Sequence, residues 1–131
     1  MIRHLGAAAV LALAIPAGAQ AQEIKAVAMF GGNEMAILYP NIVNEDCTAT
    51  KLPDVRLAAQ PTNGSVRTEP TTITLQRPRT DPRSACNGKK VEALAVHYKA
   101  NEGFVGVERL VVRADFRSGN VREYVVLIDV R

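Results

Sequence analysis

Cys47 and Cys86 are the residues of this chain most able to form a covalent link, and they are its only cysteines. They lie too far apart in sequence for a CxxC redox motif. With His97 as the one histidine beyond residue 21, they also fall short of a zinc site. An even number of cysteines favours a disulfide in a protein that leaves the cytoplasm, because the compartments outside are oxidising. We therefore predict a structural Cys47–Cys86 disulfide, and neither a metal nor a cofactor.

Segment 77–90 concentrates positive charge, with five basic residues against the single acidic residue Asp81. Two prolines and a glycine indicate that it is a loop, and Cys86 would attach this loop to the rest of the domain. Arginine presents a planar pair of N–H donors to a carboxylate or phosphate. A hydrated loop that keeps the protein soluble and guards a strand edge is the alternative. The predicted anion-binding loop consists of Arg77, Arg79, Arg83, Lys89 and Lys90.

The partner that such a loop predicts in a cell envelope is an anionic glycan or an acidic protein surface. Nucleic acid is not expected, because no aromatic residues alternate with these charges. The charge of the whole chain adds little to the argument. It is +3, and removal of Arg3 with a leader peptide would lower it to +2.

His97 is the residue most able to act as an acid or base in an enzyme. It alternates with Ala93 and Ala95 in an apolar run, which is typical of a strand. The serines beyond residue 21 lie in turn-like segments, without the G-x-S-x-G elbow that exposes a nucleophile. We therefore predict that the protein is not an enzyme. A small cell-envelope hydrolase with His97 in its site is the alternative.

Residues 1–21 have the features of a secretory signal peptide. A short basic start precedes an apolar run from Leu5 to Ile15, and Ala19-Gln20-Ala21 places small residues at the cleavage positions. The run is too short to cross a membrane, which takes roughly 20 helical residues. A lipoprotein would need a cysteine where Gln22 stands. We therefore predict cleavage of the signal helix after Ala21, a periplasmic or secreted product without a membrane span, and a single domain over residues 22–131.

The second half of the chain alternates apolar and polar residues with a period of two, as half-buried strands do. The alternation extends over residues 110–116 and 122–130. Between them, residues 117–120 (Arg-Ser-Gly-Asn) predict the turn of an antiparallel hairpin. A more apolar run over residues 91–98 predicts a buried strand.

The middle of the chain predicts a second hairpin. Segments 55–60 and 65–69 flank Pro61-Thr62-Asn63-Gly64, in which Asn-Gly favours a tight turn. Residues 71–76, rich in threonine, predict a further short strand.

The first stretch after the leader predicts one or two strands around Gly31-Gly32-Asn33, over residues 24–30 and 35–39. A long amphipathic helical period does not occur after the leader. About seven short strands with frequent turns therefore indicate an all-β protein, an Ig-like antiparallel β-sandwich.

Two further motifs, Pro61-Thr62-Asn63-Gly64-Ser65-Val66 and Tyr98-Lys99-Ala100-Asn101-Glu102-Gly103-Phe104-Val105-Gly106-Val107-Glu108, carry a family resemblance. They resemble the P-x-x-G-x-V and Y-x-P-x-x-G-F-x-G-x-D patterns of bacterial Ig-like, cadherin-like modules of exported proteins. Ala100 and Glu108 replace the usual proline and aspartate. The resemblance covers the chain from Val55 to its end. It implies a β-sandwich that spaces or binds, without an activity.

These patterns together predict a non-enzymatic periplasmic or secreted Ig-like module that binds a partner or serves as a structural unit. The sequence predicts the class of ligand, an anion, and not a specific molecule.

Overall fold

The computed structural model describes residues 22–131, and the predicted signal peptide lies outside these residues. Across the described part, no helix is both long and apolar enough to cross a membrane. Seven strands and one short 3₁₀ helix form the domain. In chain order they are β1 (Gln22–Met29), β2 (Glu34–Leu38), β3 (Asp54–Ala59), β4 (Gly64–Thr74), η1 (Pro82–Cys86), β5 (Lys90–Ala100), β6 (Gly106–Asp115) and β7 (Val121–Val130).

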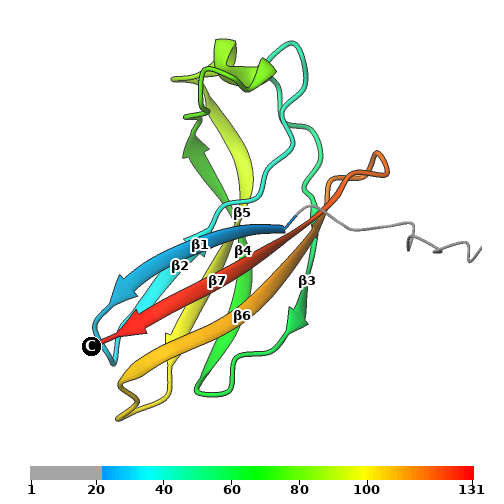
Figure 1. Cartoon of the computed structure of the whole chain (residues 1–131). Helices are drawn as coiled ribbons and strands as arrows, with labels where there is room; N and C mark the ends of the chain where they lie inside the picture. Colours follow the sequence, from blue (N-terminus) through cyan, green and yellow to red (C-terminus); the bar gives the residue numbers. More distant parts are fainter. Residues whose placement is uncertain (1–21) are drawn as a thin grey trace, which may run out of the picture.

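The strands form two sheets that pack face to face as a β-sandwich (Figure 1). One sheet has the order β1-β7-β6-β3 and the other β2-β5-β4. Strands β2, β5 and β4 occupy the places of the B, E and D strands of immunoglobulin domains, and β3, β6 and β7 those of C, F and G. The predicted all-β, Ig-like sandwich is confirmed. One pair departs from the antiparallel expectation, because β1 runs parallel to β7.

The predicted hairpin around Pro61-Thr62-Asn63-Gly64 is wrong. Its two strands belong to different sheets, since β3 pairs with β6 and β4 pairs with β5. The turn is therefore a crossover between the two layers of the sandwich. The short strand predicted over residues 71–76 is the second half of β4, which continues through Pro70. Proline is tolerated there because β4 is an edge strand.

The main core fills the space between the sheets. Alternate residues of β5, β6 and β7 point inward, as the period of two in the sequence predicts. Tyr98, Val96, Leu110, Val126 and Ile128 are almost completely buried. The hairpin between β6 and β7 forms where it was predicted, with Val111 opposite Val125 at its middle.

A second, smaller core lies beneath the long loops that follow β2 and β4. It contains Val43, Leu75, Cys86 and Val91. Cys47 and Cys86 are joined by a disulfide with their Cα atoms 5.4 Å apart, which confirms the predicted link. The bond connects the β2–β3 loop to η1 in the β4–β5 loop, so both loops are attached to one apolar cluster.

At the opposite end, one buried carboxylate organises the β3–β4 turn. Glu108 is only 3% exposed. It accepts hydrogen bonds from the backbone N–H groups of Thr62 (3.1 Å) and Asn63 (2.7 Å) and from the Tyr98 hydroxyl (3.2 Å). Burial, followed by the negative charge of Glu108, raises the pKa of Tyr98 to about 12. Residues 61–66 and 98–108, which stand apart in the sequence, are therefore joined through Glu108.

Gly64 permits this arrangement because it has no side chain. A Cβ atom at this position would overlap the Tyr98 ring and lie 2.6 Å from the carbonyl oxygen of Lys99. The close approach of the turn to the Tyr98 ring thus depends on glycine.

Candidate functional site

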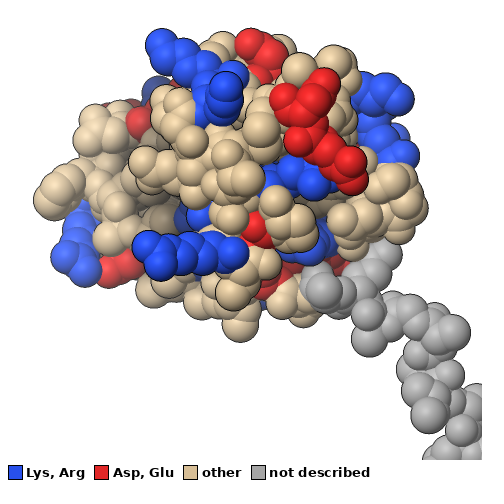
Figure 2. All heavy atoms as spheres, turned by 90° about the horizontal axis from the view of Figure 1, so that it is seen from above, with Lys and Arg blue, Asp and Glu red and all other residues tan. Residues whose placement is uncertain are grey.

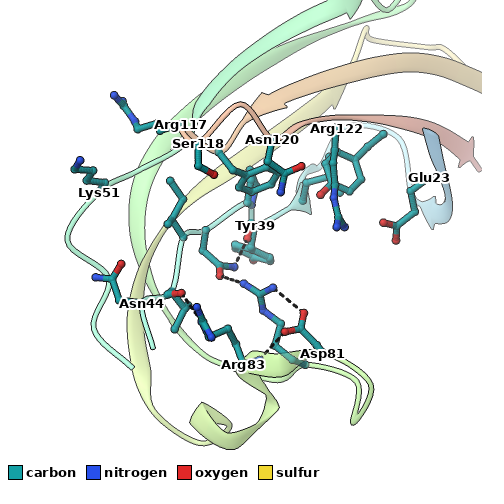
Figure 3. Close-up of a pocket in the computed structure, with 18 of the residues that line it drawn as sticks. Glu23, Tyr39, Asn44, Lys51, Asp81, Arg83, Arg117, Ser118, Asn120 and Arg122 are labelled. Carbon is teal, nitrogen blue, oxygen red and sulfur yellow. Dashed lines mark hydrogen bonds and ion pairs between the residues drawn. The ribbon is translucent and has the colours of Figure 1, made fainter. Parts of the chain in front are cut away.

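An open cleft lies at the end of the sandwich that carries the β2–β3, β4–β5 and β6–β7 loops, with a volume of about 880 Å³ (Figure 3). Its lining includes five basic and three acidic side chains: Lys51, Arg77, Arg83, Arg117 and Arg122, and Glu23, Glu45 and Asp81. Figure 2 looks onto this end and shows basic side chains at several points around the hollow, with acidic ones between them. The lining therefore has an excess of positive charge, which comes from three loops and from β7.

The β4–β5 loop holds Arg77 in a fixed position. One guanidinium nitrogen donates to Asp81 Oδ2 at 3.0 Å, and the other donates to Asn41 Oδ1 at 2.6 Å. Asn41 in turn donates from its amide to the carbonyl of Tyr39 at 2.8 Å. Arg77 thus bridges the β4–β5 loop and the β2–β3 loop. A guanidinium has five N–H donors, so further donors remain for a ligand.

Asp81 positions Arg83 as well as Arg77. Its Oδ1 accepts the backbone N–H of Arg83 at 2.8 Å, which caps the start of η1. This hydrogen bond is the main cause that holds the pKa of Asp81 below its ordinary value, with a further contribution from Arg77. Arg83 itself donates from Nε to the carbonyl of Val43 at 2.9 Å. This hydrogen bond attaches η1 to the β2–β3 loop.

The β7 side of the cleft contributes Arg122 and Tyr124. Figure 3 shows the Arg122 side chain extending into the cleft, with Glu23 on its far side. Burial raises the pKa of Tyr124, and the positive charge of Arg122 acts in the opposite direction. Arg122 of β7 and Asp81 of the β4–β5 loop line the same cleft, and the positive charge of Arg122 adds to the lowering of the Asp81 pKa that the Arg83 backbone N–H and Arg77 cause.

Lys51 and Arg117 lie at the outer margin. Figure 3 shows both side chains pointing away from the middle of the cleft. Arg117 donates from Nε to the carbonyl of Leu52 at 2.6 Å, which attaches the β6–β7 turn to the β2–β3 loop. The other basic residues of the lining are Arg77, Arg83 and Arg122.

The structure brings together part of the predicted anion-binding loop. Arg77 and Arg83 line the cleft, whereas Arg79, Lys89 and Lys90 are absent from its lining. Sequence reasoning missed Arg122, because it is a polar position on an amphipathic strand and looks like an ordinary solvent-facing residue. The turn before Arg122 could be predicted from the sequence, but the loops that this turn faces in the fold could not.

His97 lies away from the cleft, on the outer face of the smaller sheet. Its Nε2 atom is 2.8 Å from Glu69 Oε1, and its Nδ1 atom is 3.8 Å from Glu34 Oε1. Arg67 lies between the same two carboxylates and pairs with both of them. The four side chains form a charged network across β2, β5 and β4. His97 is not among the residues that line the cleft.

Among residues 22–131, no group of three or more His, Cys, Asp or Glu side chains is arranged to hold a metal ion. Four of the eight charged side chains of the cleft are guanidinium groups, which bind anions.

Neither the protein-family models nor the curated proteins contain a match to this chain. Among solved structures, the solution structure of Amebosin aligns with 87% of this chain and with 100% of its own. The identity is 10% and the TM-score is 0.42. This likeness is too distant to inform on the function of the cleft.

Proposed function

We propose that this protein is a non-enzymatic, exported Ig-like binding module that holds an anionic ligand in the cleft at the end of its sandwich. The observation that supports this function is the convergence of Arg77, Arg83 and Arg122 in one cleft. The first two come from the β4–β5 loop and the third from β7. Periplasmic or secreted localisation is part of the proposal and rests on the leader sequence and the disulfide.

The position of the cleft within the fold agrees with a binding role. The β2–β3 and β6–β7 loops correspond to the B–C and F–G loops, which form part of the antigen-binding end of antibody variable domains. Loops on a rigid β-scaffold can vary in sequence without loss of the core, and they therefore often carry binding residues. This is an analogy of position only, because a shared fold does not by itself carry a function.

Two of the three arginines are held in place before any ligand binds. Arg77 is fixed by Asp81 and Asn41, and Arg83 by the carbonyl of Val43. A side chain that is already ordered loses less conformational entropy on binding, which favours affinity. Carboxylate and phosphate groups are the anions that match the planar guanidinium.

An NMR titration with inorganic phosphate and with acetate tests the proposal. We expect amide shifts to concentrate in residues that line the cleft, and affinity to fall with added sodium chloride, because salt screens the interaction. Arg122→Ala should weaken phosphate binding about tenfold or more. Arg122 is exposed, so this variant should remain folded.

Arg109→Ala is the matched control, because Arg109 is an exposed arginine of β6 that does not line the cleft. It changes the net charge by the same amount and should leave phosphate binding nearly unchanged. Equal losses in the two variants, or shifts spread evenly over the surface, would contradict the proposed site.

A further inference from the structure

The cleft has uncharged features that specify more than an anion. Tyr39 is 46% exposed although it is a large aromatic residue. Figure 3 shows it in the middle of the cleft, between Arg122 on one side and Arg83 on the other. Its own carbonyl accepts the hydrogen bond from Asn41, which holds this part of the loop. An aromatic ring is therefore presented to solvent beside the basic groups.

Amide and hydroxyl side chains also line the cleft. Asn120 and Ser118 reach it from the β6–β7 turn. A primary amide both donates and accepts hydrogen bonds, and so does a hydroxyl. Such groups suit a ligand that carries several hydroxyl groups, each of which also donates and accepts.

The shape of the cleft disfavours two other ligand classes. Deep pockets for small apolar molecules are enclosed and mostly hydrophobic, whereas this cleft is open and its lining is rich in charged side chains. Extended peptides commonly bind by adding a strand to a free sheet edge. Here each of the edge strands β1 and β2 contributes only one residue to the lining, Glu23 from β1 and Leu38 from β2. The remaining contacts come mainly from loops.

We infer that the ligand of this cleft is a carboxylated oligosaccharide. In this arrangement the C–H face of a sugar ring stacks on Tyr39, since the face of an aromatic ring is electron-rich. The sugar carboxylate is bound by Arg122 together with Arg77 or Arg83, and the hydroxyl groups by Asn120 and Ser118. This inference rests on the proposed function, because it assumes that the cleft binds an anion.

The experiment compares three probes by calorimetry and NMR. They are a hexasaccharide of alternating glucuronic acid and N-acetylglucosamine, an uncharged N-acetylglucosamine hexamer, and a blocked peptide of alternating glycine and glutamate with the same number of carboxylates. We expect the acidic hexasaccharide to bind more tightly than either control, with amide shifts in the cleft. Tyr39→Ala should weaken its binding about tenfold, the effect of losing one stacked ring. Tyr39→Phe should retain most of the affinity.

The outcomes separate this inference from the proposed function. Equal affinity for the acidic peptide and the acidic hexasaccharide, or no effect of Tyr39→Ala, would overturn the saccharide inference while phosphate still bound in the cleft. Absence of phosphate and hexasaccharide binding together would overturn both.

Discussion

At one end of the sandwich two of the three connections are long, and a disulfide joins them to each other. At the other end the connections are short turns, and a buried carboxylate holds the β3–β4 turn. The long connections span residues 39–53 and 75–89, and the β3–β4 turn spans only residues 60–63. The open cleft of about 880 Å³ lies at the loop end, and a smaller groove of about 510 Å³ lies at the turn end. The longer loops thus leave more space between them than the short turns do.

The difference shows how each kind of connection is ordered. A short turn can be held by two backbone hydrogen bonds to Glu108, because few residues lose conformational freedom. The long loops bury little of their backbone in regular ladders. They require the Cys47–Cys86 bond and the small core around Leu75 to keep the arginines in place. The proposed binding site therefore depends on a covalent link.

The largest expected effect comes from removal of that link. The double variant Cys47→Ala, Cys86→Ala should lose about 2–5 kcal/mol of unfolding free energy, because the unfolded chain gains freedom and the small core loses its centre. Urea denaturation measures this loss. Amide signals of residues 39–53 and 75–89 should broaden in the folded variant, while those of β6 and β7 remain sharp. Uniform broadening over both ends would contradict the view that the two ends are ordered separately.

A smaller effect is expected from Glu108→Gln at the turn end. The amide keeps one acceptor oxygen and replaces the other by an NH₂ group. That NH₂ faces either the Thr62 N–H, which Oε1 accepts in the parent, or the Asn63 N–H and the Tyr98 hydroxyl, which Oε2 accepts. A buried donor without an acceptor costs about 1–3 kcal/mol, so we expect a loss near 2 kcal/mol. Chemical denaturation provides the measurement.

Glu102→Gln is the matched control, because Glu102 is exposed on the neighbouring β5–β6 turn. It should change the unfolding free energy by less than about 0.5 kcal/mol. Phosphate binding at the opposite end should be unaffected by Glu108→Gln. A change in phosphate affinity would mean that the two ends are coupled.

The smallest expected effect is on the stability of the protein at acidic pH. The pKa of Asp81 is below its ordinary value of 3.8 in the folded protein, first because of the Arg83 backbone N–H and then because of Arg77. The ionised form therefore stabilises the fold above pH 3.8, and this contribution disappears as pH falls through the folded-state pKa. Comparison of unfolding at about pH 6 and about pH 2 should show a smaller acid-induced loss in Asp81→Asn than in the parent, by less than about 1 kcal/mol. An identical loss in both proteins would show that Asp81 does not contribute to this pH dependence.

The local patterns of the sequence were sufficient for the strand positions and the disulfide. Alternation over residues 110–116 and 122–130 depends only on neighbouring residues, and so does the turn between them. The disulfide required no knowledge of the fold, because two cysteines allow one intramolecular pair. These predictions succeeded where the physical cause lies within a few residues, or where two cysteines leave a single possible pairing.

Sheet membership and the composition of the cleft were decided only by the tertiary structure. Asn63-Gly64 favours a tight turn whether its strands pair with each other or cross between layers, and here β3 pairs with β6. Arg122 joins Arg77 and Arg83 only because the sandwich brings the β4–β5 loop and β7 to the same end of the molecule. Such contacts depend on long-range packing of the whole core, which no local sequence pattern encodes.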